Sequence, residues 1–340
     1  SREETVADSL TEALPLVQGA YSLVVLTRDK VIAARDPMGF RPLCLGRFQD
    51  SYVVASESCA FDIIGARYLR DVEPGELVIL GEGELASRRL APKQQERFCV
   101  FEHVYFSRPD SQVFGISVEW ARRRCGEILG REAPADADLV MAVPDSSNTA
   151  ALGYARGTGL PFELALIRNH YVGRTFISPA QKVRDMSVRI KFNPVREVLE
   201  GKRVVVVDDS IVRGTTMRKL VKLLRNAGAR EVHLRIASPP VTNPCFYGID
   251  TPRRKELIAS SHTVEEIATY LRVDSLHYLS LGGLLEATGE GHRYCNACFT
   301  GQYPVPFGEE PEKDVFDRHA AGAEIILEPR DGGGTGGGAA

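Results

Sequence analysis

The fold of this chain is decided by residues 204–216, which read Val204-Val205-Val206-Val207-Asp208-Asp209-Ser210-Ile211-Val212-Arg213-Gly214-Thr215-Thr216. Four consecutive valines predict a strand that is buried on both faces, as in a parallel sheet. A small, hydroxyl-rich loop follows. A helix is predicted after it, because Met217, Leu220, Val221 and Leu224 share one helical face and Gly228 provides a stop.

The loop of this strand–loop–helix unit has the features of a phosphate site. A loop that leads into a helix presents free backbone N–H groups and the positive end of the helix dipole. Asp208 and Asp209 follow the strand at its carboxyl end, where open α/β sheets bind their ligands. Two adjacent carboxylates are more than helix capping needs, and they can accept hydrogen bonds from sugar hydroxyls. The predicted ligand is therefore a ribose phosphate.

The rest of the chain divides into a β-rich part and an α/β part. Over residues 1–90, a hairpin is predicted from 19–26 and 31–36, with further strands at 52–55 and 75–80. The charged stretch 87–96 is interpreted as a linker. From residue 98 onward, helical patterns alternate with apolar strands, which predicts βαβ units and a parallel sheet. Besides the valine strand, the predicted strands are 139–143, 162–167, 232–237 and 276–281.

Composition excludes several classes of protein. The 340 residues are 44% hydrophobic and 26% charged, which is typical of a globular protein of two domains. The net charge of −3 gives no basic footprint for nucleic acid, and no apolar run is long enough to span a membrane. Seven cysteines are an odd number and argue against a secreted disulfide framework, so we expect a cytoplasmic protein.

Two further segments are candidates for the ligand site. Pro144-Asp145-Ser146-Ser147 follows the strand at 139–143 and precedes a helix start, so it is a second candidate phosphate loop, although Asp and Ser are also ordinary helix caps. The polar, basic segment around 169–191 lacks an apolar stripe, and we interpret it as a lid over an anionic ligand. Arg174 and Lys191 are its candidate functional cations; a solvated surface loop is the alternative.

The cysteines fall into two groups. Cys295-Asn296-Ala297-Cys298 has metal-ligand spacing. Cys99 lies in the apolar stretch 98–101, and Cys245 follows Asn243-Pro244. A CxxC pair alone can be a redox pair, half of a zinc site or a coincidence. Four thiolates could hold zinc or an iron–sulfur cluster, and spacing does not separate these. The other three cysteines are interpreted as small core residues.

The loop at 208–216 resembles the phosphoribosyl pyrophosphate (PRPP) loop of the type I phosphoribosyltransferases. Longer phrases resemble the amidophosphoribosyltransferase family up to about residue 307. They are Arg35-Asp36-Pro37-Met38-Gly39-Phe40-Arg41-Pro42-Leu43, residues 102–111, 171–177 and 245–250, and Cys298-Phe299-Thr300-Gly301. One branch of that family carries a [4Fe–4S] cluster, and Cys99, Cys245, Cys295 and Cys298 match all four of its ligand positions. The resemblance therefore implies a structural cluster.

The resemblance also implies an activity: a glycosyltransferase of purine synthesis that joins glutamine-derived ammonia to PRPP, forms 5-phosphoribosylamine and releases pyrophosphate. Asp208 and Asp209 would hold the ribose hydroxyls and help to place Mg²⁺ together with Ser146. The 5-phosphate would be held by the loop residues, with Ser147 as a further substrate contact. Those loop residues are Ser210, Val212, Arg213, Gly214, Thr215 and Thr216. Purine nucleotides are implied as inhibitors, and we expect a homo-oligomer.

The implied domains are part of a glutaminase of the N-terminal-nucleophile class over 1–90, a phosphoribosyltransferase domain over 91–320, and a flexible glycine-rich tail over 321–340. Ser1 is followed by Arg2-Glu3-Glu4, which is unlike the strand that follows the family's nucleophilic cysteine. We therefore interpret the chain as a fragment that does not hydrolyse glutamine. Two alternatives are a salvage phosphoribosyltransferase that uses a nucleobase, and a non-catalytic regulator that senses PRPP.

Overall fold

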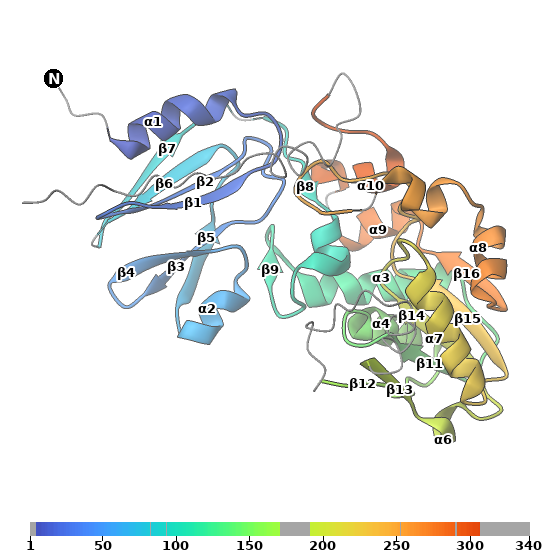
Figure 1. Cartoon of the computed structure of the whole chain (residues 1–340). Helices are drawn as coiled ribbons and strands as arrows, with labels where there is room; N and C mark the ends of the chain where they lie inside the picture. The colour runs from blue at the N-terminus through green and yellow to red at the C-terminus, as the bar shows by residue number, and fades with distance from the viewer. Residues whose placement is uncertain are drawn as a thin grey trace, which may run out of the picture. The chain divides into compact units, whose positions relative to one another are not determined.

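The computed structural model describes residues 5–81, 83–92, 94–170, 191–251, 253–289 and 291–306. The described residues up to Val305 form one compact unit. Within it, the β-rich residues 5–90, here called the N-terminal layer, precede an α/β part (Figure 1). This succession agrees with the predicted fold class, a partial glutaminase β-layer followed by a parallel-sheet domain.

The N-terminal layer contains two antiparallel sheets. The first has the order β1 (Ser22–Leu26), β2 (Val31–Arg35), β6 (Glu76–Leu80), β7 (Leu85–Arg89), and the second has the order β4 (Ser51–Ala55), β3 (Cys44–Phe48), β5 (Arg67–Asp71). Residues such as Ala33 and Val78 of the first sheet and Leu45 of the second share one buried core. The helices are α1 (Val6–Ala13), the 3₁₀ turn η1 (Leu14–Leu16) and α2 (Cys59–Ile64).

The predicted hairpin is confirmed, because β1 pairs with β2 in antiparallel register. The predicted linker is wrong at its start. Residues 87–89 belong to β7, which pairs with β6 and places Ser87 opposite Val78. The charged side chains that suggested a linker belong to a strand at the sheet's edge, where polar residues are tolerated.

The α/β part is built on a parallel sheet with the order β11 (Leu139–Ala142), β14 (Arg203–Asp208), β15 (Glu231–Ile236), β16 (Ser275–Tyr278). The prediction of a continuous strand at 162–167 is wrong. Phe162 makes only a single parallel bridge to Val140, and the chain then turns away. β12 (Leu166–Arg168) instead pairs antiparallel with β13 (Phe192–Pro194). The last strand ends at Tyr278, before the predicted 281.

The valine strand is buried on both faces, as predicted. Val204 to Val207 are fully buried. Val205 and Val207 pack in the core that includes residues of α3 (Val118–Glu132) and α4 (Asn148–Thr158). Val204 and Val206 pack in the other core with α7 (Thr215–Asn226). This alternation follows from the two-residue period of a strand and places helices on both sides of β14.

Helices α3 and α4 pack closely because glycines lie at their crossing. A Cβ at Gly126 of α3 would lie 1.9 Å from the carbonyl oxygen of Ala150, and one at Gly153 of α4 would lie 2.0 Å from that of Arg123. Only glycine allows the two backbones to approach this closely. The crossing fixes α3 against the helix that follows the predicted second phosphate loop.

The remaining elements surround the sheet or connect the two parts. They are β8 (Phe98–Cys99), the π-helical turn η2 (Glu102–Phe106), β9 (Gln112–Val113), β10 (Ile116–Ser117), α6 (Arg196–Leu199), η3 (Arg254–Glu256), η4 (Ile258–Ser260), α8 (Val264–Leu271), α9 (Leu281–Ala287), η5 (Gly291–Arg293), β17 (Tyr294–Cys295) and α10 (Ala297–Thr300). Among the described residues, no helix has the length and apolar character needed to cross a membrane.

Candidate active site

The candidate active site lies where the loops after β11 and β14 meet. After β11 the chain passes through α4 to the bridge at Phe162 on one side, and after β14 it passes through α7 to β15 on the other. The two neighbouring strands therefore send their following segments in opposite directions. The carboxyl ends of the strands at such a switch point are where doubly wound sheets bind ligands.

The two aspartates are joined to both loops by hydrogen bonds. Ser147 Oγ donates to Asp208 Oδ1 at 2.8 Å, and the backbone N–H of Asp209 donates to the same oxygen at 3.0 Å. Ser210 Oγ donates to Asp209 Oδ1 at 2.6 Å. Ser238, which follows β15, donates from its hydroxyl to the carbonyl of Asp209 at 2.8 Å. The sequence prediction that Asp208, Asp209 and Ser147 share one site agrees with this geometry.

Burial makes this carboxylate pair unusual. Desolvation and the neighbouring charge of Asp209 raise the pKa of Asp208 well above its ordinary value. Desolvation also raises the pKa of Asp209, although hydrogen bonds from Ser210 and Ser146 and the charge of Arg122 oppose it. Two close, buried carboxylates favour a bound proton or a bound cation between them. The pair is therefore suited to a ligand that brings hydroxyl donors and a metal ion.

The loop after the aspartates leads directly into α7. Gly214 is the N-cap of α7 with a φ of 72°, and as a glycine it has no side chain that could cap the first N–H groups of the helix. Thr215 and Thr216 begin the helix and are exposed, and Val212 is half-buried. The carbonyl of Val212 accepts from the N–H of Ile258 at 2.9 Å. These features leave the start of α7 available to an anion.

The second loop lies beside the first and is joined to it by the hydrogen bond from Ser147 to Asp208. The peptide bond between Pro144 and Asp145 is cis, and Ser147 is fully buried. Ser146 is half-buried, and a hydrogen bond from its hydroxyl lowers the pKa of Asp209. Asp145 pairs with Arg168 of β12 at 2.8 Å. The structure therefore brings Ser146 and Ser147 together with Asp208 and Asp209.

The three basic residues among the predicted site residues have different surroundings. Arg213 is exposed, and its Nη2 pairs with Glu256 Oε2 at 2.6 Å. Lys191 is exposed at the base of the β12–β13 pair, where its carbonyl accepts from Asn169 N at 2.8 Å. Arg174 lies outside the described residues. The roles predicted for these residues stay predictions.

The four predicted cluster ligands line one apolar cavity, together with side chains such as Phe40, Phe101 and Tyr247. Cys99 and Cys295 are register partners in the parallel β8–β17 pair. The carbonyl of Cys298 accepts from the backbone N–H groups of residues 242 and 243, two residues before Cys245. Burial raises the pKa of Cys295 to about 11. Within the described part of the chain, no group of three or more His, Cys, Asp or Glu side chains is arranged to hold a metal ion.

Sequence reasoning missed Arg122 and Ser238. Arg122 is 3% exposed and lies on the buried stripe of α3, in step with Val118, Cys125 and Leu129. That position was a usable signal, because an arginine among apolar residues at helical spacing must find buried partners. Ser238 could have been found as the first hydroxyl after the strand at 232–237.

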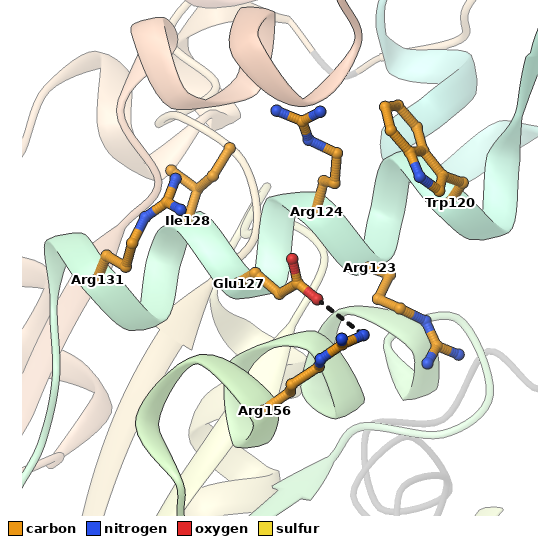
Figure 2. Close-up of a pocket in the computed structure, with 7 residues that line it drawn as sticks. All are labelled: Trp120, Arg123, Arg124, Glu127, Ile128, Arg131 and Arg156. Carbon is orange, nitrogen blue, oxygen red and sulfur yellow. Dashed lines mark ion pairs between the residues drawn. The ribbon is translucent and has the colours of Figure 1, made fainter.

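A second groove, of about 400 Å³, is lined by α3 and by Arg156 of α4 (Figure 2). Its other lining residues are Trp120, Arg123, Arg124, Glu127, Ile128 and Arg131. The arginines are paired with carboxylates: Arg123 with Glu119, Arg124 and Arg131 with Glu286, and Arg156 with Glu127. These pairs compensate much of the positive charge of the groove. An anion is therefore better placed at the start of α7, where the N-cap is a glycine.

The sheet order, the two loops at the switch point and the aspartate pair define a phosphoribosyltransferase domain. The comparisons agree: the family described as phosphoribosyl transferase domain matches residues 122–237, and the glutamine amidotransferase domain family matches residues 3–62. The amidophosphoribosyltransferase of Archaeoglobus fulgidus is 52% identical over 314 residues, which are 91% of this chain and 69% of that protein. The amidophosphoribosyltransferase of Bacillus subtilis is also 52% identical, over 88% of this chain and 64% of its own length.

Solved structures give the same result. The structure of glutamine PRPP amidotransferase from B. subtilis, complexed with ADP and GMP, has a TM-score of 0.84 and 51% identity, and the match covers 90% of this chain and 68% of that one. The chain therefore belongs to the amidophosphoribosyltransferase family. It spans about half to two thirds of the length of the curated relatives that it matches.

Proposed function

We propose that this chain catalyses the phosphoribosyl transfer of its family: ammonia attacks C1 of PRPP, pyrophosphate leaves, and 5-phosphoribosylamine forms. The observation that carries the proposal is the meeting of Asp208, Asp209 and Ser147 in front of the uncapped start of α7. Family membership at 52% identity supports it. The salvage alternative is not supported by the match to a glutamine amidotransferase domain at residues 3–62.

Each residue of the site binds a different part of PRPP or holds another residue in place. Asp208 and Asp209 accept hydrogen bonds from the ribose hydroxyls, which orients C1 toward the acceptor. The N–H groups and hydroxyls at Gly214, Thr215 and Thr216 receive the 5-phosphate at the helix start, with Ser210, Val212 and Arg213 completing the loop. Ser147 holds Asp208 in place. Positioning and charge stabilisation are the main contributions that such residues make to a transfer of this kind.

Mg²⁺ fits this donor set, because it prefers oxygen ligands and shares them with substrate phosphates. Asp208, Asp209 and Ser146 are the residues that would hold it. Bound there, the ion would neutralise charge on the leaving pyrophosphate. The raised pKa values of the two aspartates are consistent with a carboxylate pair that a bound cation would stabilise. Arg174 and Lys191 are proposed to complete the anion site from the segment between β12 and β13.

The four cysteines fit a [4Fe–4S] cluster. In such a cluster each cysteine ligates a different iron, so the thiolates surround the group and do not converge on one ion. Cys99, Cys245 and the Cys295–Cys298 pair come from three segments that line one apolar cavity. The cluster would tie β8, β17 and the start of α10 to the segment at 245. Iron and sulfide analysis of anaerobically purified protein, with Cys298→Ser as control, tests this assignment.

Further family properties extend the proposal. The B. subtilis structure is a complex with ADP and GMP, and we propose that purine nucleotides bind and inhibit this protein. We retain the expected homo-oligomer, the domain division at residues 90 and 320, and a reducing compartment such as the cytoplasm. None of the seven cysteines forms a disulfide in this structure, which suits that compartment.

The test is Mg²⁺-dependent release of pyrophosphate from PRPP, with ammonia, glutamine or hypoxanthine supplied separately. Release with ammonia that is lost in Asp208→Asn supports the proposal, and Asp29→Asn, an exposed aspartate of the N-terminal layer, is the matched control. Release only with hypoxanthine would support the salvage alternative. Tight PRPP binding without release for any acceptor would support the regulator.

A further inference from the structure

One segment, residues 102–112, is held by the N-terminal layer at its first residue and over its last five; we call it the linking segment. At its start, Arg41 Nη2 pairs with Glu102 Oε1 at 2.9 Å. Further on, Glu57 Oε2 accepts from the backbone N–H of Arg108 at 2.7 Å and from Ser111 Oγ at 2.8 Å. At its end, the N–H of Gln112 donates to Ser58 Oγ at 2.8 Å.

The first of these contacts is a buried ion pair. The side chain of Glu102 is 3% exposed. Its second carboxylate oxygen accepts from Ser107 Oγ at 2.6 Å, inside the same segment. A buried carboxylate that loses its cation is costly, so removal of the Arg41 charge would destabilise the linking segment at Glu102. The segment contains the π-helical turn η2, a conformation that is rare and often found near functional sites.

The linking segment in turn positions α3. Its carbonyls at Pro109 and Ser111 accept from the N–H groups of Glu119 and Val118, both at 3.0 Å, and so bind the helix start. One turn later, the buried guanidinium of Arg122 donates from Nε to the carbonyl of His103 at 2.9 Å and from Nη2 to that of Ser107 at 2.7 Å. The linking segment therefore holds α3 by its backbone and by Arg122.

Helix α3 contacts the helix that follows the second loop of the proposed PRPP site. Glu119 Oε2 accepts from Thr149 Oγ1 at 2.6 Å, and Thr149 lies two residues after Ser147, which donates to Asp208. The charge of Arg122 also acts on Asp209. A set of contacts thus runs from Arg41 through the linking segment and α3 to Thr149, two residues from the serine that binds Asp208.

We propose that Arg122 is a positioning residue through which the linking segment couples the N-terminal layer to the PRPP site, so that removal of the contact at Arg41 weakens PRPP binding. The proposal rests on the proposed function for its ligand. Coupling between sites is a free energy that double substitutions can measure, and values of about 5- to 150-fold in affinity are usual.

The experiment compares the full chain with Arg41→Met, Arg122→Met and the double variant. Calorimetry measures PRPP affinity with Mg²⁺, and hydrogen exchange followed by mass spectrometry reads the backbone at 102–112 and 204–216 without PRPP. The control is Arg108→Gln, whose side chain lies in the linking segment but pairs only with the exposed Asp110 among the described contacts. Arg122→Lys keeps the charge and serves as the conservative variant.

Each single variant is expected to lower PRPP affinity about tenfold, and the double variant to lower it no further than Arg122→Met, because both act along one set of contacts. Exchange should rise at both segments in Arg41→Met and remain unchanged in Arg108→Gln, and Arg122→Lys should recover part of the affinity. The proposal would be overturned if the affinity losses of the two single variants multiplied in the double variant. It would also be overturned if Arg41→Met left both affinity and exchange unchanged.

Two outcomes separate this inference from the proposed function. If the unsubstituted chain does not bind PRPP, the proposed function fails, and the exchange at 204–216 in Arg41→Met still decides the coupling. If Arg122→Met does not fold, Arg41→Met and Arg122→Lys carry the test, and unchanged exchange at 204–216 in both would contradict the inference.

Discussion

Replacement of Gly126 by alanine should destabilise the protein at the crossing of α3 and α4. The new Cβ would lie 1.9 Å from the carbonyl oxygen of Ala150 and 2.8 Å from the backbone nitrogen of Tyr154. Both neighbours are backbone atoms of a packed helix and cannot rotate away. Cβ contacts below 3.0 Å are essentially never seen, so the helices must separate by about 1 Å.

The size of the effect follows from two opposing contributions. Overpacking of a core costs about 1–3 kcal/mol, and a clash between two backbones belongs at the upper end of that range. Alanine would return up to about 1 kcal/mol through its better helix propensity. We expect a net loss of about 2 kcal/mol in the free energy of unfolding, and a melting temperature lower by about 4 °C or more.

The assay is urea unfolding followed by circular dichroism, together with a thermal melt. Gly282→Ala is the matched control, because Gly282 lies exposed in α9 and the nearest atom to its new Cβ is Ser280 Oγ at 3.8 Å. The control should be unchanged or slightly more stable. A Gly126→Ala variant as stable as the unsubstituted chain would refute the reasoning that this crossing depends on glycine.

Three further predictions concern buried polar groups. Burial, and then the charge of Arg122, lower the pKa of His103 to about 4. The folded state therefore keeps His103 neutral, and this stabilises the fold fully only above the unfolded pKa near 6.5. The free energy of unfolding, measured with urea, should fall by about 2 kcal/mol between pH 7.5 and pH 5. His103→Gln should not show this loss. Ser147→Ala removes the hydroxyl bound to Asp208 and should weaken PRPP binding about tenfold in calorimetry, whereas Ser261→Ala, at an exposed serine, should leave it unchanged. Arg235→Met removes the buried guanidinium that donates to the carbonyls of Ala133 and Pro134, and should lower the free energy of unfolding by about 3 kcal/mol; equal urea midpoints would contradict this.

The parallel sheet and its ligand loops could be predicted from local pattern alone. The valines at 204–207 and the helical stripe from Met217 to Leu224 have unambiguous periodicities, and both were confirmed. Hydroxyls and carboxylates directly after strands necessarily gather at one edge of a parallel sheet. That rule is sufficient to place Ser147 beside Asp208 from sequence.

Features that depend on long-range pairing could not be predicted. The apolar run at 162–167 has strand composition, but β12 pairs with β13, a segment about 25 residues further on, and no local signal specifies that partner. Likewise, the charged residues at 87–89 are a strand only because β6 offers an open edge. The partners of Arg122 are backbone carbonyls of residues 103 and 107, which carry no side-chain signature in the sequence.

The most direct test of the account is calorimetric titration of the full chain with PRPP, with and without Mg²⁺, beside Asp208→Asn, Asp209→Asn and the exposed control Asp29→Asn. The account predicts Mg²⁺-dependent binding at one site, weakened at least tenfold in both site variants and unchanged in the control. Binding that survives in both site variants, or no binding to the unsubstituted chain, would contradict the claim that residues 208–216 form a PRPP site.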